Sequence, residues 1–532
     1  MDRKRYRIRI ILPAFPPFNI YGRIANSTTS LGPVDVGTAA NKLESWDVEI
    51  IDENNLHGRF YPKTKDGTID HERLQEERPA DIVGFYGSMT SAAPRLYKLA
   101  ALYKQLKVRT ISGGYHVKNL PLEALNSNID IVVMGEGETT IRHLLLAFEN
   151  KTPINNIPGI SFLRDGRMIT TIAQELIDDL DYLAFPDFNL VRYAKIKTYP
   201  IGRIRGCNFN CEFCAVKDRA RCSSPEWMMA QIAHLVETRG ARRFFDVSDH
   251  FVASGVDDAV HFCNLLSDYQ KKTGIRLRMT IQIRINDAVH KNLLEAMKEA
   301  GIDNVCIGIE SCIDEELLVM RKGYREKDIL KWIDTYHGYG FFIHGMMIFG
   351  YPEKPDRQIN MSLTEKIKRF KEFVRHLDTA QVLLPVPLPG TELTDRLRTE
   401  GRLYDIDYQY YDGQFPLFEP DGEVTPEELQ YGVQEIMGGF YHFWHLGHLI
   451  KAILIHFPLI VFPRVVTLTT LRVRYLTNGF RMWHQTFWRT NALRFGGNII
   501  VRNWKKSFQE GGFLEQLEKA KDKLLIKRTK KP

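Results

Sequence analysis

Short apolar runs alternate with helix-length amphipathic segments through residues 6–150. This alternation is typical of βα units and predicts an α/β domain with a doubly wound parallel sheet. The expected strands lie at 7–12, 47–51, 82–86, 109–113 and 129–134, and the expected helices at 36–43, 95–105 and 139–148. Ligands bind at the carboxyl ends of the strands in such sheets. The loops that follow these strands are therefore the candidate binding segments.

The same alternation resumes from residue 199 to about 390 and predicts a second α/β unit. Its expected strands lie at 199–204, 243–247, 278–282, 304–309, 341–348 and 379–384. Residues 151–198 between the two units are expected to be a connector, with a hairpin around the tight turn Asp165-Gly166. We therefore expect four regions: 1–150, the connector at 151–198, a core at 199–395, and a mostly helical, aromatic and basic region at 396–532.

Length, composition and charge indicate a multidomain globular protein of a reducing compartment. A chain of 532 residues is too long for one hydrophobic core, and 44% hydrophobic with 26% charged residues is typical of soluble globular proteins. Seven unevenly spaced cysteines predict a reducing compartment, so we expect a cytoplasmic location. The apolar run at 8–12 is too short for a signal peptide. The net charge of +7 is compatible with an anionic membrane surface or with nucleic acid and decides neither.

The strongest chemical signal is a group of three closely spaced cysteines, Cys207-x3-Cys211-x2-Cys214. Thiolates suit zinc or iron–sulfur clusters, but a closed zinc site or a fully ligated cluster needs a fourth ligand. No second, matching CxxC or Cys/His pair stands near the motif. Three thiolates on a four-iron cluster would leave one iron open to a substrate. The alternative is a chance group of reduced cysteines, and the strand-like segment 199–204 with Gly206 before the motif argues against it.

This spacing, with the aromatic Phe213 before the third cysteine, resembles the radical S-adenosylmethionine (SAM) superfamily. The resemblance implies that the three cysteines hold one [4Fe–4S] cluster whose open iron binds SAM, and that Phe213 is one of the contacts to the bound cofactors. An electron from the cluster, delivered by a donor such as flavodoxin or ferredoxin, would cleave SAM to a 5′-deoxyadenosyl radical. It also implies that 199–395 form a partial (β/α)6 TIM-like barrel, with the chemistry at the carboxyl ends of its strands.

Distinctive residues follow successive strands of this expected barrel. Any one of them could be a solvated strand end, but five in succession favour a binding site. The resemblance implies contacts to the SAM amino group, carboxylate, ribose and adenine from the following residues: Ser248, Asp249, Arg284, Glu310 and Gly350. Arg284 can pair with the carboxylate through two hydrogen bonds.

The loops of the first domain resemble the cobalamin-binding domain that precedes many radical SAM cores, which is Rossmann-like. The resemblance implies that the corrin and its nucleotide tail contact Ser88, Thr90, Gly113, Gly114, His116, Gly135, Glu136, Gly137 and Glu138. The Asp-x-His-x-x-Gly stretch that supplies a lower histidine ligand in other cobalamin proteins is missing, and His57 has the wrong spacing. We therefore expect cobalamin without a histidine ligand. A domain that keeps the fold and has lost the corrin is the alternative.

The other cysteines are expected to be structural. Cys263 and Cys306 lie in apolar helix and strand patterns and are predicted to be small core residues. Cys312 follows Glu310-Ser311 and is expected to pack in the core, with radical quenching as the alternative. Because there is no second cysteine cluster in the sequence, we predict one iron–sulfur centre.

Among functions, methylation of an unactivated carbon with cobalamin as the methyl carrier is the first expectation. The second is oxidative ring closure or carbon–carbon coupling, as in relatives of the anaerobic magnesium-protoporphyrin ester cyclase. A cobalamin or redox sensor without turnover is a third possibility from a different class. The complete set of SAM-binding residues argues against the sensor, because a sensor needs no contacts to ribose and carboxylate.

The C-terminal region suggests a membrane surface. The run at 450–462 is strongly apolar but shorter than the roughly 20 residues of a spanning helix. Arginines lie among Trp444, Trp483, Trp488 and Trp504, a pairing that suits the headgroup boundary of an anionic bilayer. RNA could use the same pairing, but the aliphatic run has no use there, and no nucleic acid is expected. We predict a peripheral enzyme on the inner face of the membrane with a hydrophobic substrate, such as an isoprenoid or acyl lipid; a buried core helix is the alternative.

Overall fold

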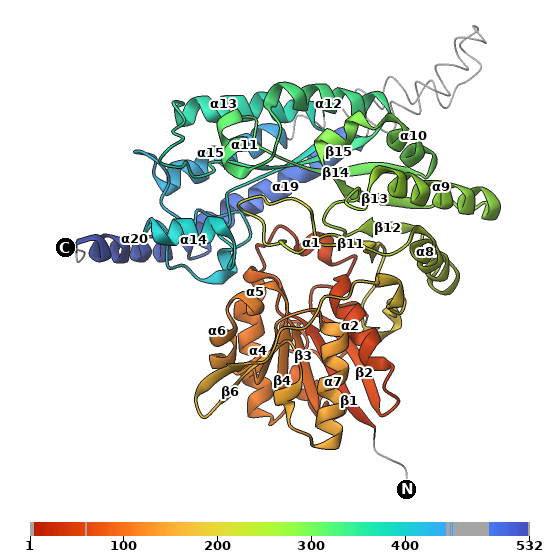
Figure 1. The fold of residues 1–532 in the computed structure, drawn as a ribbon. Coiled ribbons are helices and arrows are strands. Elements are labelled where there is room, and N and C mark those ends of the chain that lie inside the picture. The colour runs from red at the N-terminus through yellow and green to blue at the C-terminus, as the bar shows by residue number, and fades with distance from the viewer. Residues whose placement is uncertain (1–4, 59–60, 443–446, 448–449, 451–488, 530–532) are drawn as a thin grey trace.

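The computed structural model describes residues 5–58, 61–442, 447, 450 and 489–529. Two α/β domains stack on each other, and two separate segments, one with α1 and one with β11, lie at their junction (Figure 1). This arrangement confirms the expected architecture: a Rossmann-like domain, a partial TIM-like barrel and a helical C-terminal region.

The N-terminal domain is built on one eight-stranded sheet in the order β7-β6-β5-β4-β3-β1-β2-β8. Its parallel strands are β1 (Tyr6–Leu12), β2 (Trp46–Asp52), β3 (Ile82–Tyr86), β4 (Arg109–Gly113), β5 (Ile131–Val133) and β8 (Val191–Arg192). The antiparallel hairpin β6 (Ile160–Arg164) and β7 (Arg167–Thr170) extends one edge. The segment expected to be a connector therefore supplies strands to both edges of this sheet.

Helices cover the sheet, and their bounds are α1 (Gly22–Ala25), α2 (Leu31–Asn41), α3 (His71–Glu77), α4 (Ala93–Gln105), α5 (Tyr115–Asn119), α6 (Pro121–Asn126) and α7 (Gly137–Asn150). The β1 strand is buried along most of its length, as expected for a central strand between two helical layers. Short 3₁₀ helices lie at Thr90–Ala92, Ile154–Asn156, Leu180–Tyr182, Phe188–Leu190, Ile285–Val289, Val374–His376 and Tyr408–Tyr410.

The second domain is an open barrel of six parallel strands in the order β16-β15-β14-β13-β12-β9. The strands are β9 (Tyr199–Ile201), β12 (Arg243–Asp246), β13 (Arg278–Ile283), β14 (Ile302–Glu310), β15 (Phe342–Ile348) and β16 (Thr379–Leu383). The helices between them are α8 (Pro225–Arg239), α9 (Val256–Thr273), α10 (Lys291–Glu299), α11 (Asp314–Met320), α12 (Glu326–Gly338) and α13 (Leu363–Phe373).

Burial alternates along the barrel strands. In β13, Met279, Ile281 and Ile283 are buried whereas the residues between them are only partly buried, so one face packs against helices. Cys263 in α9 and Cys312 after β14 are fully buried, and burial raises the pKa of Cys263 and of Cys306 to about 12. These three thiols are therefore protonated packing groups near neutral pH.

The C-terminal region forms α14 (Glu392–Thr399), α15 (Pro426–Phe440), α19 (Arg489–Glu510) and α20 (Phe513–Thr529). Thr425 and Glu428 form a capping box at the start of α15. The α19 helix packs beside α15 and β16 (Figure 1). No helix among the described residues is both long enough and apolar enough to cross a membrane.

Two members of the aromatic and basic group belong to the interior rather than to a surface. Trp504 is 1% exposed, and its Nε1 donates to the Gln414 carbonyl at 2.8 Å. Arg494 donates to the carbonyls of Leu377 and Asp378. The predicted lipid-facing role is thus corrected for these two residues, because α19 needs them to dock on the barrel. Trp444, Trp483, Trp488 and residues 451–462 lie outside the described part of the chain.

Candidate active site

The three cysteines of the motif lie on the loop that joins β10 (Ile204–Arg205) to β11 (Arg221–Cys222), hereafter the cysteine loop (206–220). The Cys207 amide donates to the Asp218 carbonyl at 3.0 Å and closes the base of the loop. Gly206 has a φ of +86°, and a Cβ there would lie 2.4 Å from the Arg219 carbonyl oxygen. Glycine is therefore required directly before the first cysteine.

All three thiols are free; Cys211 is buried, and Cys207 and Cys214 are half-buried. Burial raises the pKa of Cys207 and of Cys214, so metal binding here would release protons. No set of three His, Cys, Asp or Glu side chains among the described residues is grouped tightly enough to hold a single metal ion. Separated thiolates on one loop are the arrangement that suits a cluster, whose irons each take their own ligand.

A buried glutamate inside the motif fixes the far side of the cysteine loop. Glu212 accepts hydrogen bonds from Arg396 Nε at 3.0 Å and from the Tyr351 hydroxyl at 2.8 Å, and Lys354 Nζ lies 3.2 Å away. Burial alone would raise the pKa of Glu212, but these donors lower it overall. Arg396 also donates to the Glu353 carbonyl at 2.8 Å. Sequence reasoning missed this brace, because the partners lie far apart in the chain and carry no local signal.

Two of the predicted SAM ligands lie beside the loop, together with a cation that sequence reasoning missed. The Arg284 guanidinium lies 3.7 Å from the centre of the Phe209 ring, within the cysteine loop. Lys322 Nζ lies 3.2 Å from Glu310 Oε1 and is buried. Burial would lower the pKa of Lys322, but Tyr324 and Glu310 raise it overall. Lys322 follows α11 rather than a strand, so the strand-end pattern could not identify it.

Ser248 and Asp249, which follow β12, are tied to the base of the cysteine loop. The Ser248 hydroxyl accepts from the Ile204 amide at 3.0 Å, and Asp249 Oδ2 accepts from the Gly206 amide at 3.2 Å. Burial raises the pKa of Asp249. Both side chains therefore connect the second barrel strand to the motif.

The remaining two predicted SAM contacts lie at different places. The Phe213 ring meets the Tyr351 ring edge-on, with 6.2 Å between the ring centres. Gly350 faces α15, where a Cβ would lie 2.3 Å from Leu429 Cδ1. The structure thus groups Phe213 with the residues that hold Glu212, and it packs Gly350 against α15.

A cavity of about 420 Å³ lies between the two domains, hereafter the interdomain cavity. It is lined by most of the predicted cobalamin contacts: Ser88, Gly113, Gly114, Gly135, Glu136, Gly137 and Glu138. The barrel contributes Gly206 and Asp249, so the cysteine loop and the cobalamin loops border one space. Gly114 has a φ of +125°, and a Cβ there would lie 2.4 Å from Ser88 Oγ. These loops therefore pack together only with glycine at this position.

Two predicted cobalamin contacts do not line this cavity. His116 is buried with Nε2 3.1 Å from the Tyr97 hydroxyl, and Thr90 is buried at the start of a 3₁₀ helix. His57 Nε2 lies 3.1 Å from the Asn26 carbonyl oxygen, also away from the cavity. No histidine of the described residues lines the cavity. Tyr115 does line it, and burial followed by the charge of Asp249 raises the pKa of this phenol.

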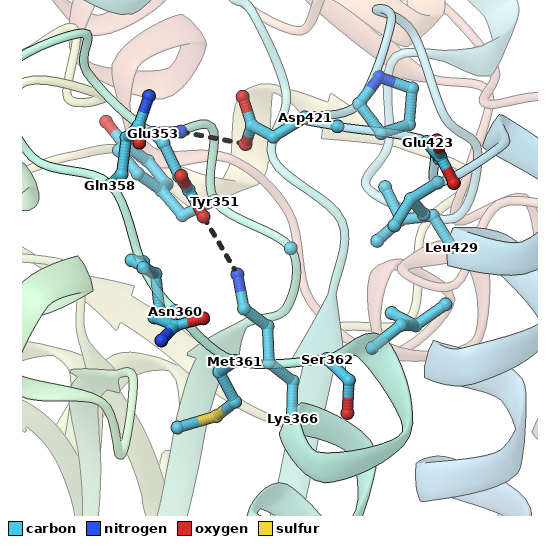
Figure 2. Close-up of a pocket in the computed structure, with 16 residues that line it drawn as sticks. Tyr351, Glu353, Gln358, Asn360, Met361, Ser362, Lys366, Asp421, Glu423 and Leu429 are labelled. Carbon is cyan, nitrogen blue, oxygen red and sulfur yellow. Dashed lines mark hydrogen bonds and ion pairs between the residues drawn. The ribbon is translucent and has the colours of Figure 1, made fainter.

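A second cavity of about 500 Å³ lies between the loop that follows β15 and the start of α15 (Figure 2). Lys366 Nζ lies 3.5 Å from Glu353 Oε1, and the Glu353 amide donates to Asp421 at 2.9 Å. Of the predicted site residues, only Gly350 lines this cavity, whereas eight line the interdomain cavity; no cysteine lines either one. We therefore place the active site at the interdomain cavity, although it is the smaller one.

Comparison with known families agrees with this geometry. Residues 201–364 match the radical SAM superfamily, and residues 23–145 match the B12 binding domain. The first match contains the cysteine loop, and the second contains most of the loops at the interdomain cavity. The chain is a cobalamin-dependent radical SAM enzyme.

Several proteins resemble this radical SAM enzyme over much of its length. An uncharacterized methyltransferase of Pyrococcus horikoshii is 26% identical over 428 residues, which cover 77% of this chain and 86% of that protein. The anaerobic magnesium-protoporphyrin IX monomethyl ester cyclase of Cereibacter sphaeroides is 25% identical over 73% of this chain and 64% of its own length. The hopanoid C-2 methylase of Rhodopseudomonas palustris is 27% identical, with 43% and 44% covered.

Solved structures share the fold. The cobalamin-dependent radical enzyme OxsB with aqua-cobalamin and SAM bound superposes with a TM-score of 0.64 at 13% identity, covering 98% of this chain and 81% of OxsB. TsrM of Kitasatospora setae with cobalamin and a [4Fe–4S] cluster gives a TM-score of 0.59 at 15% identity, covering 82% and 89%. The radical SAM and B12-binding matches give this enzyme a [4Fe–4S] cluster, SAM and cobalamin as cofactors, as predicted.

Proposed function

We propose that this radical SAM enzyme methylates an unactivated carbon of a hydrophobic small molecule. The observation that carries the proposal is the shared interdomain cavity, where the loops of the B12-binding domain and the cysteine loop face each other. A substrate between them would be within reach of both cofactors. Much of the lining is apolar, including Leu31, Val36, Ile111, Val133 and Leu176. Apolar walls favour an apolar substrate and exclude water from a reactive radical.

The chain's own residues fit the cofactors in defined roles. Cys207, Cys211 and Cys214 would hold the cluster, and Arg284 with Lys322 supplies two cations for the carboxylate of SAM. Glu310 would accept from the ribose or the amino group. When bound, the cluster supplies the electron that cleaves SAM, and cobalamin supplies the methyl group. The hydrogen atom removed from the substrate carbon ends in 5′-deoxyadenosine, and one methyl group replaces it.

A lipid is the preferred substrate class. The apolar cavity and the similarity to a protein named hopanoid C-2 methylase support it. We also propose a cytoplasmic location at the inner face of the membrane and a donor of the flavodoxin or ferredoxin type. The membrane part is carried by the apolar run at 450–462, most of which lies outside the described residues.

Membrane association can be tested without disturbing α19. Because Trp504 docks this helix on the barrel, only residues 451–488 are replaced by a flexible linker of equal length. The full chain should float with anionic liposomes, and the replaced chain should stay in solution at the same salt concentration. Equal recovery of both proteins in the soluble fraction would reject the membrane role.

Methyl transfer is tested with SAM that carries a trideuterated methyl group. The reconstituted enzyme is incubated with dithionite and with the lipid extract of a strain that lacks the gene. We expect a new product that carries three deuterium atoms, with one 5′-deoxyadenosine and one S-adenosylhomocysteine formed per product. A product without label would reject methylation, and absence of 5′-deoxyadenosine above background would favour the sensor.

Oxidative ring closure or carbon–carbon coupling is the second candidate. It is favoured by the cyclase of Cereibacter sphaeroides, which matches more of this chain than the hopanoid methylase does. The same experiment separates the two reactions. Ring closure would give a product that has lost two hydrogen atoms relative to its substrate and carries no deuterium.

A further inference from the structure

The two strands that close the cysteine loop place two arginines directly opposite each other. Arg205 in β10 pairs in register with Arg221 in β11. Both side chains reach the B12-binding domain rather than the barrel. Arg205 Nη1 donates to Glu136 Oε1 at 2.9 Å, and Arg221 Nη1 donates to Glu136 Oε2 at 2.9 Å. One carboxylate of the cobalamin loop is thus held through both oxygens by the base of the cysteine loop.

Arg205 makes two more contacts to the same domain. Its Nη2 donates to Glu138 Oε1 at 2.6 Å and to Asp35 Oδ2 at 3.2 Å. Glu138 is 7% exposed and Asp35 in α2 is largely buried. Between the two glutamates, a Cβ on Gly137 would lie 2.7 Å from Val36 Cγ2. The loop at 135–138 is therefore pressed against α2 on one side and joined to the two arginines on the other.

These two arginines and three carboxylates are more buried than ordinary surface ion pairs. Exposed pairs contribute little, whereas the Arg221 side chain is 3% exposed and the Glu136 side chain 14%. All five charged residues line the interdomain cavity. Removing one partner of such a group leaves uncompensated buried charge, which is strongly unfavourable. The group therefore has a steep energetic preference for one arrangement of the two loops.

We propose that Arg205 and Arg221 are positioning residues that fix the cysteine loop to the cobalamin loop 135–138 and so set the separation of the two cofactors. The inference rests on the proposed function, since it concerns the distance across which a substrate would receive its methyl group. In this view Glu136 and Glu138 act as anchors between the domains. Misplacement by about 1 Å is enough to lower the rate of a positioned reaction roughly 100-fold.

The test uses the full chain with conservative variants. Arg205→Lys keeps one charge but cannot reach three carboxylates, and Glu138→Gln keeps the shape but removes one charge. Arg203→Lys is the matched control. Arg203 is buried in the same segment, but its guanidinium bonds Ser254, Asp258 and the Ser223 carbonyl within the barrel.

Two measurements are made. Hydrogen–deuterium exchange is followed in the cofactor-free protein at residues 134–138 and 204–222. Dipolar electron paramagnetic resonance then gives the distance distribution between cob(II)alamin and the reduced cluster in the loaded protein. We expect exchange at 134–138 to accelerate at least roughly tenfold in Arg205→Lys and Glu138→Gln, with a broadened distance distribution. Arg203→Lys should lower the melting temperature and leave exchange at 134–138 and the distance distribution unchanged.

Wild-type exchange and a wild-type distance distribution in Arg205→Lys and Glu138→Gln would overturn the proposal. If Arg203→Lys changed both readouts equally, the effect would be general loosening, and the positioning role would also be rejected. Failure of the wild-type chain to bind a corrin would reject the proposed function alone. The exchange measurement on the cofactor-free chain would still decide whether the two arginines join the loops.

Discussion

The two sides of the cysteine loop are held by buried charges of opposite balance. On the barrel side, one carboxylate, Glu212, meets the cations Arg396 and Lys354 and the Tyr351 hydroxyl. On the domain side, the cations among the described residues that pair with the three carboxylates are Arg205 and Arg221, and the Ile177 amide donates one further hydrogen bond to Glu136. The three carboxylates are Asp35, Glu136 and Glu138. The first side has enough donors for its carboxylate, and the second has a carboxylate in excess.

This difference in charge balance affects the pKa values of the carboxyl groups on the two sides. The pKa of Glu212 is lowered overall, so the barrel side keeps its charge in mildly acidic solution. Burial raises the pKa of Asp35 to about 7, with Glu138 adding to the effect of burial and Arg205 opposing it. A proton on Asp35 restores the balance on the domain side. The charge of the barrel side is therefore expected to stay constant near neutral pH, whereas the charge of the domain side changes as Asp35 gains or loses its proton.

The largest effect is expected from the loop that both sides hold. Replacing any one of Cys207, Cys211 and Cys214 by Ala should abolish the charge-transfer absorbance and all SAM cleavage, because an incompletely ligated cluster is not retained. The measurement is iron and sulfide content together with 5′-deoxyadenosine formation. Cys222→Ala, in β11 next to the loop, is the control and should keep full iron content. Stoichiometric iron and activity in one of the three variants would contradict the assignment.

The second largest effect is expected on folding stability, when the contacts of Glu212 on the barrel side are removed. In Arg396→Ala, Glu212 keeps Tyr351 and the half-exposed Lys354 but loses its best donor. Truncating one partner of a buried charge pair costs about 2–5 kcal/mol, and chemical unfolding of the cofactor-free chain measures it. Arg398→Ala on the same helix is the control. Its pair with Asp395 is exposed, and its loss should change stability by less than about 1 kcal/mol. Equal losses for both variants would show that Glu212 is not a brace.

The sequence predicted the strands of both sheets well, because buried parallel strands read as apolar runs with turn residues at their ends. The expected strand at 7–12 is β1 (Tyr6–Leu12), and the expected strand at 341–348 is β15 (Phe342–Ile348). The motif and the strand-end residues Arg284 and Glu310 were also within reach of sequence reasoning. These signals are local: a spacing, or a polar residue directly after an apolar run.

The sequence could not predict the ion-pair partners of Glu212 and Glu136. Arg396 lies 184 residues from Glu212, and Arg205 lies 69 residues from Glu136. Neither pair has a spacing that a local pattern could detect. The predicted position of His116 differs for another reason. The short helix α5 directs the His116 ring to Tyr97, whereas the adjacent Tyr115 lines the interdomain cavity. One residue of helical rotation decides which side chain reaches the site, and the loop sequence does not specify it.

The excess carboxylate on the domain side should make the free energy of unfolding depend on pH. The folded pKa of Asp35 is raised to about 7, so between about pH 4 and 7 the folded chain holds a proton that the unfolded chain has released. Stability contributed by this proton falls as pH rises through that window, by at most about 1.4 kcal/mol per pH unit, and the slope vanishes above it. Asp35→Asn should remove this part of the slope.

The measurement for Asp35 is the difference between wild type and Asp35→Asn in free energy of unfolding from pH 4 to 8. The difference is needed because Asp52, with a pKa raised to about 6, and Asp412, raised to about 7, give slopes of the same sign. Burial is the main cause for both. Parallel curves for the two proteins would show that Asp35 is charged throughout and that the domain side is as constant as the barrel side.

The smallest expected effect concerns the cobalamin face of the cavity. His57 bonds Asn26 away from the cavity, and His116 is buried against Tyr97. We therefore expect the cob(II)alamin spectrum to lack nitrogen splitting from a protein imidazole and to stay unchanged in His57→Ala. His116→Ala should lower stability through lost packing and leave the splitting pattern unchanged. A resolved nitrogen triplet that disappears in either variant would contradict this. It would mean that the domain side moves enough on cobalamin binding to bring a histidine into the cavity. An unchanged spectrum in both variants would show that neither histidine binds the cobalt and that both keep the positions that the structure shows, against Asn26 and Tyr97.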